Sequence, residues 1–219
     1  MKKFLHSFWV LACVLCIVFY TPEAAHSNQS GAPAGNTGSL GDGGQNCTSC
    51  HGDATPGVFT DNIAIIPFNV PDQYNAGVTY SFDVFGSSNS SDKFGFELIA
   101  EDDEGNPIGE IILTDMQNTQ LTNGYLTHTN TGTNGNGMGG IVWNFDWQSP
   151  IDFEGNVTFY AAGIIANGNN QNSGDIIVTT NFPFVIVSGT FEEVFGCTDP
   201  FAINFNPFAT DDDASCEYE

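Results

Sequence analysis

Short runs in which every second residue is apolar follow one another along most of this chain, separated by clusters of Gly, Asn, Asp, Ser or Pro. A period of two puts the apolar side chains on one face of a β-strand, whereas an amphipathic helix needs a period near 3.6. The runs lie at residues 58–67, 78–85, 94–100, 108–114, 141–147, 155–165 and 175–187. Seven or so short strands without an amphipathic helix predict an all-β chain, folded as an immunoglobulin-like antiparallel β-sandwich.

The apolar faces of these runs define a candidate core. The predicted inward residues are Val78, Tyr80, Phe82 and Val84; Phe94, Phe96, Leu98 and Ala100; Trp143, Phe145 and Trp147; and Val157, Phe159 and Ala161. We expect the aromatic members to fill the space between two sheets, with Phe96, Trp143, Phe145 and Phe159 in its core. A sugar-stacking platform formed by Trp143 and Trp147 is the alternative. Pro183 within the last run indicates an edge strand or a bulge.

The acidic stretch from Glu101 to Pro107 separates two of the runs. Its Asp, Glu, Gly, Asn and Pro residues are those of a turn. We therefore expect a solvated hairpin tip there and not a cation site.

The first 27 residues are typical of an export signal. Lys2 and Lys3 form a basic start, residues 8–20 are apolar, and Ala25-His26-Ser27 is a small-x-small cleavage site. The apolar run is short for a membrane span, and Cys13 and Cys16 lie within it. We expect cleavage after Ser27, which leaves no transmembrane span and gives a secreted or cell-surface protein.

The chain after residue 27 is strongly acidic. Removal of Lys2, Lys3 and Glu23 leaves 25 of the 26 acidic residues against Lys93 alone, so the net charge becomes −24. Such a polyanion repels nucleic acid and anionic lipid. Its expected partner is an extracellular or cell-surface protein or glycan, and an acidic surface also keeps a secreted protein soluble.

Cys47, Cys50 and His51 form a C-x-x-C-H sequence within the Gly-rich residues 28–57. Two thiols at this spacing can reach both vinyl groups of one porphyrin, and the following histidine is placed to ligate the iron. The sequence therefore predicts a c-type haem, which is attached outside the cytoplasm. Two alternatives stay open: a structural or redox disulfide between the two cysteines, and a zinc half-site for which the nearby sequence supplies no fourth ligand.

The segment that contains the C-x-x-C-H is too small to enclose a haem by itself. Residues 28–57 are too short to wrap a haem in helices, so the haem would lie against the sandwich or against a partner. A sixth iron ligand would have to come from His128, Met116 or Met138. Because His128 is the only other histidine after residue 27, a Ser-His-Asp site cannot be proposed, and we expect no enzyme activity.

Residues 191–219 form a separate tail with two cysteines, Cys197 and Cys216. An exported chain with an even number of cysteines favours a disulfide between these two, worth on the order of 3 kcal/mol for a loop of this length. The loop also offers oxygen ligands suited to Ca²⁺, although their spacing is not that of an EF-hand. These candidate ligands are Asp199, Asn204, Asn206, Asp211, Asp212 and Asp213.

Three sequence blocks, residues 143–150, 155–163 and 166–168, resemble the end of the Reeler (reelin-like) domain. The similarity is greatest to the exported bacterial version called the choice-of-anchor V domain. There, a segment like residues 31–38 commonly runs into a C-x-x-C-H. The resemblance covers residues 31–187 and implies an immunoglobulin-like sandwich with a binding or adhesion role.

A further block, residues 196–216, begins Gly-Cys-Thr-Asp-Pro and ends at Cys216. It resembles a short Cys-bracketed module of secreted proteins from Bacteroidetes-type bacteria, where it often precedes a sorting domain of the type IX secretion system. The predicted organisation is a signal peptide (1–27), a Gly-rich segment with the C-x-x-C-H (28–57), a Reeler-like sandwich (58–190) and an acidic module (191–219).

Two functions are consistent with these features. The first is a secreted or cell-surface Reeler-like protein whose c-type haem acts in electron transfer or haem-based sensing. The alternative is a non-catalytic extracellular binding or adhesion module with a structural disulfide between Cys47 and Cys50 and no haem.

Overall fold

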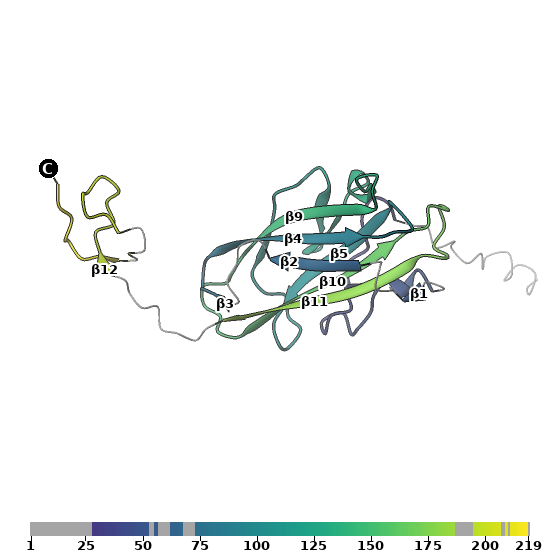
Figure 1. Ribbon diagram of the computed structural model, residues 1–219. Helices are drawn as coiled ribbons and strands as arrows, with labels where there is room; N and C mark the ends of the chain where they lie inside the picture. Colours follow the sequence, from purple (N-terminus) through teal and green to yellow (C-terminus); the bar gives the residue numbers. More distant parts are fainter. Residues whose placement is uncertain are drawn as a thin grey trace, which may run out of the picture.

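The computed structural model describes residues 28–52, 55–56, 62–67, 73–186, 195–206, 209 and 211–218. The predicted signal peptide, residues 58–61 of the first predicted strand, and residues 187–194 lie outside the described residues. Apart from two short 3₁₀ helices, the regular elements of the described chain are β-strands, and those of residues 55–186 form two packed sheets (Figure 1). The all-β antiparallel sandwich predicted from the period of two is therefore confirmed.

One sheet has four strands in the order β2-β4-β9-β6. All its pairings are antiparallel. The strands are β2 (Asn62–Pro67), β4 (Thr79–Ser87), β9 (Gly140–Gln148) and β6 (Glu110–Leu113).

The other sheet has seven strands, ordered β1-β11-β10-β5-β8-β7, with β3 also pairing with β11. They are β1 (Thr55–Pro56), β3 (Gln73–Tyr74), β5 (Phe94–Glu101), β7 (Thr119–Thr122), β8 (Tyr125–His128), β10 (Asn156–Ile165) and β11 (Ile176–Ile186). The short strands β1 and β3 pair in parallel with opposite ends of β11, and the other pairings are antiparallel. Pro183 lies between these two short pairings, which agrees with the predicted edge position.

Aromatic side chains from both sheets meet in the core. The ring centroids of Phe96 and Trp143 are 4.3 Å apart, and those of Phe82 and Phe159 are 4.6 Å apart. The predicted core residues Phe96, Trp143, Phe145 and Phe159 are all buried. The one predicted inward residue that is wrong is Val78, which is 40% exposed and lies just before β4.

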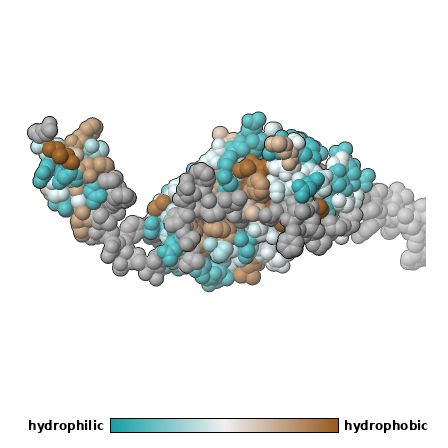
Figure 2. Space-filling model, in the orientation of Figure 1, coloured by the Kyte–Doolittle hydropathy of each residue, from teal (hydrophilic) through white to brown (hydrophobic). Residues whose placement is uncertain are grey.

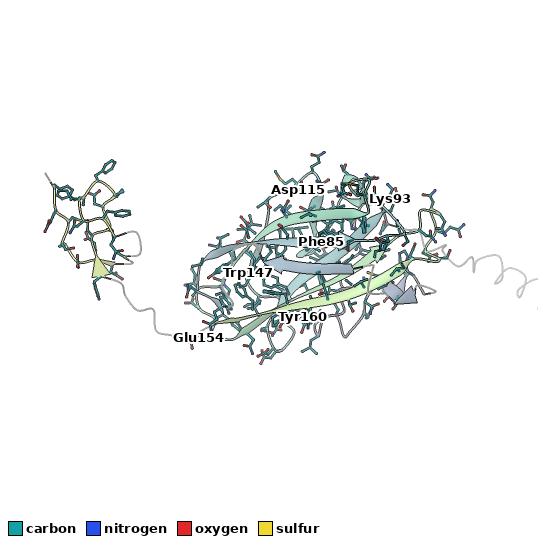
Figure 3. All side chains as sticks on the ribbon, viewed as in Figure 1. Phe85, Lys93, Asp115, Trp147, Glu154 and Tyr160 are labelled. Atoms are coloured by element: carbon teal, nitrogen blue, oxygen red, sulfur yellow. A yellow bond between two sulfur atoms is a disulfide. The ribbon has the colours of Figure 1, made fainter. Side chains whose placement is uncertain are left out.

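Both tryptophans considered for a sugar platform are core residues. Trp143 and Trp147 are fully buried, and Trp147 lies within the body of the sandwich (Figure 3). Their indole N–H groups donate to the carbonyl oxygens of Gly132 (2.8 Å) and Ile108 (3.0 Å). The platform alternative is therefore wrong, because neither ring face is available to a ligand.

The hairpin β7–β8 has no counterpart among the predicted strands. It turns at Asn123-Gly124, where both residues have positive φ, 50° and 89°. Positive φ at both central residues is the conformation of a type I′ turn, for which Asn-Gly is the preferred pair. That dipeptide was the available signal for this hairpin.

Strand β5 is buried along its whole length, on both faces. Its inner face meets the core, and its outer face is covered by the N-terminal residues 28–46, which we call the strap. This covering corrects one prediction. Glu101 is buried and bonded to the strap, and only the turn that follows it forms the expected hairpin tip.

The tail contains β12 (Phe195–Gly196) and β13 (Asp211–Asp212), which pair in parallel. The disulfide between Cys197 and Cys216 is present, as predicted. Two single-turn 3₁₀ helices, η1 (Cys47–Ser49) and η2 (Thr131–Thr133), complete the elements. Over the described residues, no helix has the length and apolar character needed to cross a bilayer.

Candidate functional site

The strap is fixed to the outer face of the seven-stranded sheet by carboxylates of β5. Glu101 accepts hydrogen bonds from the Ser39 hydroxyl (2.6 Å) and from the Gly41 backbone N–H (3.0 Å). Glu97 accepts one from the Asn36 backbone N–H (2.7 Å). Charge-assisted hydrogen bonds of this kind are stronger than neutral ones, so they give order to a segment that has no apolar core.

Strand β8 holds the strap at two further points. The Tyr125 hydroxyl donates to Asp42 (2.6 Å), and the Ala32 backbone N–H donates to the Thr127 hydroxyl (2.9 Å). The same Asp42 accepts hydrogen bonds from the backbone N–H and hydroxyl of Thr37 within the strap. These hydrogen bonds fix the path of the strap over the sheet, and the C-x-x-C-H sequence follows directly after it.

The two thiols of that sequence lie in different environments. Asn46 caps η1 by accepting the Thr48 N–H (2.9 Å), and Cys47 then packs against Ala162 and Ile177 of the sheet. Cys47 is 9% exposed and Cys50 is exposed, and both are free thiols. Burial, followed by the charge of Glu97, raises the pKa of Cys47 to about 12.

His51 is buried and oriented by one carboxylate. Its Nδ1 lies 2.7 Å from Oδ2 of Asp175, which is itself buried just before β11. The other oxygen of Asp175 accepts the Asn167 N–H (3.0 Å), and the Asn172 side chain donates to the Cys50 carbonyl (2.5 Å). The β10–β11 loop therefore holds the C-terminal end of the C-x-x-C-H turn, at Cys50 and His51.

The Asp175 contact sets the role of each nitrogen of the His51 ring. A carboxylate accepts, so Nδ1 carries the proton, and Nε2 is left with its lone pair. No described residue makes a hydrogen bond to Nε2. This is the tautomer in which a histidine ligates a metal through Nε2.

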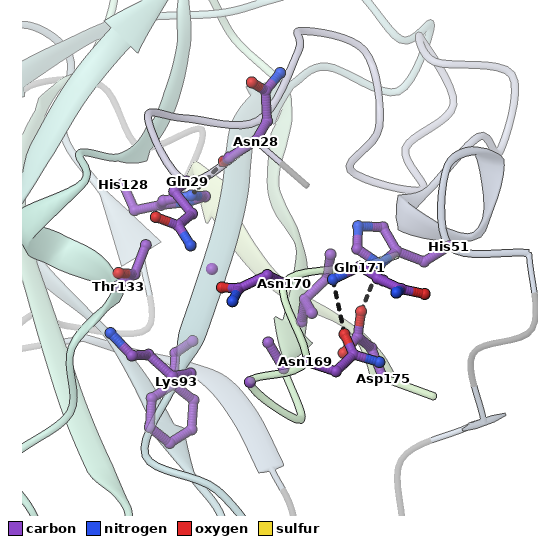
Figure 4. A pocket seen from close by; sticks show the side chains of 15 residues that line it. Asn28, Gln29, His51, Lys93, His128, Thr133, Asn169, Asn170, Gln171 and Asp175 are labelled. Carbon is purple, nitrogen blue, oxygen red and sulfur yellow. Dashed lines mark hydrogen bonds and ion pairs between the residues drawn. The ribbon is translucent and has the colours of Figure 1, made fainter. Parts of the chain in front are cut away.

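A pocket of about 190 Å³ opens beside His51 (Figure 4). His51 and Asp175 line one side, and His128, Thr133 and Lys93 line the opposite side. Asn169, Asn170 and Gln171 of the β10–β11 loop contribute amides between them. The only lysine and the only two histidines of residues 28–219 therefore line one pocket, at the end of the sandwich where Lys93 lies (Figure 3).

His128 has both ring nitrogens engaged. Nδ1 accepts the Phe96 backbone N–H (3.1 Å), and Nε2 faces the Asn28 carbonyl oxygen at 3.3 Å. Burial lowers the pKa of His128, so the ring is neutral at pH 7. The ring also fits closely against Gly95, where a Cβ atom would lie 2.9 Å from Cε1.

The other predicted iron ligands are elsewhere. Met116 and Met138 are 77% and 86% exposed, and neither lines the pocket. The structure thus brings His51 and His128 to one pocket and leaves both methionines outside it. Asp175 and Asn172, which orient the turn, were missed because nothing in the local sequence links them to a segment more than 120 residues away.

The candidate calcium ligands of the tail mostly cap turns. Asp212 and Asp213 accept backbone N–H groups two residues ahead, from Ala214 (3.1 Å) and Ser215 (2.9 Å). Asp199 accepts the Tyr218 hydroxyl (2.7 Å). Within the described part of the chain, no three His, Cys, Asp or Glu side chains are grouped closely enough to hold a metal ion.

The residues at the C-x-x-C-H turn fit a covalently attached haem in two respects. His51 offers an oriented Nε2, and the exposed Cys50 thiol is accessible. Cys47 fits only if its thiol leaves its packing against Ala162 and Ile177. The pocket is smaller than the roughly 300–1,000 Å³ of typical ligand sites, so a porphyrin would lie mainly at the surface.

No family model matches the chain, and no curated protein matches it. Similar solved structures include the reeler domain of human F-spondin, with 18% identity over 61% of this chain and 95% of that chain and a TM-score of 0.44. Another is the Reelin-N domain of F-spondin, with 18% identity over 64% of this chain and 97% of that chain and a TM-score of 0.45. AvmM, which catalyses macrocyclization in alchivemycin A biosynthesis, is also similar, with 11% identity, 60% and 93% coverage and a TM-score of 0.35. These similarities are too low to assign a family or a function.

Proposed function

We propose that this chain is an exported protein with one c-type haem, which acts in electron transfer or in sensing a small ligand of the iron. Cys47 and Cys50 would hold the porphyrin through thioether bonds, and His51 would ligate the iron through Nε2. The observation that carries the proposal is the 2.7 Å contact between Nδ1 of His51 and Asp175. When bound, the haem would supply a one-electron redox centre.

The Asp175 carboxylate supports the proposal because a metal-ligating histidine commonly donates its other ring N–H to a carboxylate. It fixes the tautomer and the ring orientation. Asp175 is in turn fixed by the Asn167 N–H, so the ligand is oriented before any haem arrives. If the contact between His51 and Asp175 were only structural, the oriented histidine would have no reason to come directly after two cysteines at the spacing for haem attachment.

Lys93 is the residue that would pair with a haem carboxylate. In a chain with a net charge of −24 after signal removal, an anionic porphyrin would otherwise meet only negative charge. Lys93 lines the pocket on the side opposite His51, and its ammonium group donates to the Asn134 side chain. This location supports a counter-ion role for the one cation available.

His128 is proposed not to ligate the iron, which would leave the iron able to bind an external ligand. His128 shares the pocket, but its Nε2 faces the Asn28 carbonyl oxygen. Ligation by His128 would therefore require the start of the strap to move. A haem held in this way would be exposed to solvent and low in potential.

Export supports the same proposal. The signal-like residues 1–27 and the Cys197–Cys216 disulfide both fit an oxidising compartment outside the cytoplasm, where c-type haem is attached. Location at the cell surface or in the medium is therefore part of the proposal, and the role is electron exchange or sensing and not enzyme catalysis.

The second candidate function is an extracellular adhesion module without haem. The tail favours it, because Phe201 and Ile203 are exposed there, and apolar residues lie on the surface of the tail (Figure 2). The proposed partner is then a protein or a neutral glycan, since the acidic surface disfavours nucleic acid. In this case Cys47 and Cys50 would form a structural disulfide.

An absorbance spectrum separates the two functions. The protein and its Cys47→Ala/Cys50→Ala variant should be expressed with a signal peptide in a host that has cytochrome c maturation proteins. The proposal expects a Soret band after denaturation for the wild type and none for the variant. Equal spectra, or no band in either, would favour the adhesion module.

A further inference from the structure

The two thiols of the C-x-x-C-H differ in what covers them. Cys50 is exposed, whereas Cys47 lies against Ala162, Ile164 and Ile177 on the outer face of the sheet. A thiol reacts as the thiolate and must also be reached by the reagent. Cys47 is buried, so a reagent reaches its sulfur poorly while the residue stays packed.

Cys47 is continuous with the strap that crosses the same face. The strap ends at Asn46, and Asn46 caps the turn that begins with Cys47. Ala162, which Cys47 covers, is the cross-strand neighbour of Glu97, which holds the strap at Asn36. Undocking of the strap would therefore uncover the Cys47 thiol.

The strap is attached by groups that also oppose its docking. Glu97 is fully buried, and its Oε1 has no hydrogen-bond partner among the described residues. Asp42 places a second carboxyl group close to Glu97 from within the strap, while Lys93 donates to Asn134 instead. Buried like charges without a counter-charge weaken the state that contains them. These bonds lie on the outer face of the sheet, so the strap is attached apart from the aromatic core.

We propose that the strap is a cover for Cys47, so that the two thiols are modified in a fixed order. Cys50 reacts while the strap is docked, and Cys47 reacts only while the strap is undocked. The order holds for any electrophile that forms a thioether, and haem attachment at Cys47 would then precede docking. The inference concerns the thiols of the chain and stands whether or not haem is attached.

Iodoacetamide is a suitable probe. The thiolate sulfur displaces iodide and forms one S–C bond, and the thiol proton passes to solvent. The reduced protein, made in a host without haem maturation proteins, is alkylated for a series of times, and the modified cysteines are then located by peptide mass mapping. Cys50 serves as the reference within the same molecule, because it is exposed in either state of the strap.

We expect Cys50 to be modified at least tenfold faster than Cys47 in the wild type. Glu101→Ala removes two charge-assisted hydrogen bonds to the strap, and it should raise the Cys47 rate by roughly tenfold or more without changing Cys50. Glu104→Ala is the matched control, since Glu104 is an exposed glutamate in the neighbouring turn whose own hydrogen bond is to Asp102 and not to the strap. It should leave both rates unchanged.

Equal rates for the two cysteines in the wild type would overturn the proposal. So would a Cys47 rate that Glu101→Ala does not change while the variant keeps the fluorescence of the buried Trp143 and Trp147. If Glu101→Ala does not fold, Ser39→Ala removes one of the same hydrogen bonds from the strap side. The proposal then requires a smaller rise in the Cys47 rate, and no rise would contradict it.

Discussion

Two short, irregular segments with a pair of cysteines each lie on either side of the sandwich in the sequence, and they are ordered in different ways. The N-terminal segment, residues 28–52, is held by hydrogen bonds to β5, β8 and the β10–β11 loop, and its cysteines are free. The C-terminal tail, residues 195–218, is closed by its own Cys197–Cys216 disulfide.

The difference shows what each pair of cysteines can be used for. A small segment without a hydrophobic core is ordered either by a covalent link or by contacts with a larger folded domain. The tail uses its cysteines for the link. The N-terminal segment obtains its order from the sandwich, and so its two thiols remain available for a cofactor.

A substitution in the core should produce the largest difference between the two segments in their amide hydrogen exchange. Phe159 is fully buried between the sheets, so Phe159→Ala should lower the free energy of unfolding by about 3–5 kcal/mol. If the strap depends on the sandwich, amide hydrogen exchange should speed up in residues 28–46 and not in the tail. A loss below about 1 kcal/mol in urea melts would show that the core assignment is wrong.

Removal of the tail disulfide should affect the tail and leave the strap unchanged. Cys197→Ser/Cys216→Ser removes a link across a loop with a sequence separation of 19, worth about 3 kcal/mol to the tail in the chain-entropy account. Exchange should rise throughout residues 195–218 and stay unchanged in the strap. Loss of strap protection in this variant would contradict the independence of the two segments.

A change of pH should act on the strap alone. Burial raises the pKa of Glu97 to about 7, above its value in a solvated chain. A raised pKa means that docking is most stable when Glu97 is protonated, and that this stability is lost as the pH rises through 7. At about 1.4 kcal/mol per pKa unit, the loss is a few kcal/mol at most. Asp42, Tyr125 and Cys47 are the titratable groups that act on Glu97, and Glu101 lies four residues further along β5 and acts on the same Tyr125.

The ratio of Cys47 to Cys50 alkylation reports this change. It should rise between pH 5 and pH 8 in the wild type. Glu97→Gln keeps an acceptor for the Asn36 N–H but cannot ionise, and so its ratio should stay constant. A wild-type ratio that does not change with pH would exclude Glu97 as the group that weakens docking.

Calcium should have the smallest effect, and only on the tail. The carboxylates of Asp199, Asp212 and Asp213 already accept hydrogen bonds within the tail. We expect weak binding, with a dissociation constant of about 10⁻⁴–10⁻³ M, as in extracellular modules. Titration calorimetry that shows no heat with millimolar Ca²⁺ would remove this prediction.

The sequence was sufficient for the sandwich because its signal is local. A period of two places Phe82, Phe96 and Phe159 inward whatever the order of the strands. The β7–β8 hairpin was missed although Asn123-Gly124 marks its turn. The burial of Glu97 and Glu101 could not be predicted, because it depends on a strap about 60 residues away in the sequence.

The candidate site was predictable only in part for the same reason. Cys47, Cys50 and His51 are adjacent in the sequence, so their spacing alone indicates haem attachment. The partner of His51 is Asp175, 124 residues away, and only the fold brings the two together. The fold also separates His128, which lines the pocket, from Met116 and Met138, which do not.

We propose above all that the free thiols of the N-terminal segment carry a haem. The most direct test is the mass of the protein purified from a host with cytochrome c maturation proteins, with peptide mapping of residues 28–52. The account predicts one haem adduct bound through both Cys47 and Cys50, together with an intact Cys197–Cys216 disulfide. Only free or disulfide-linked Cys47 and Cys50, with no added haem mass, would contradict it.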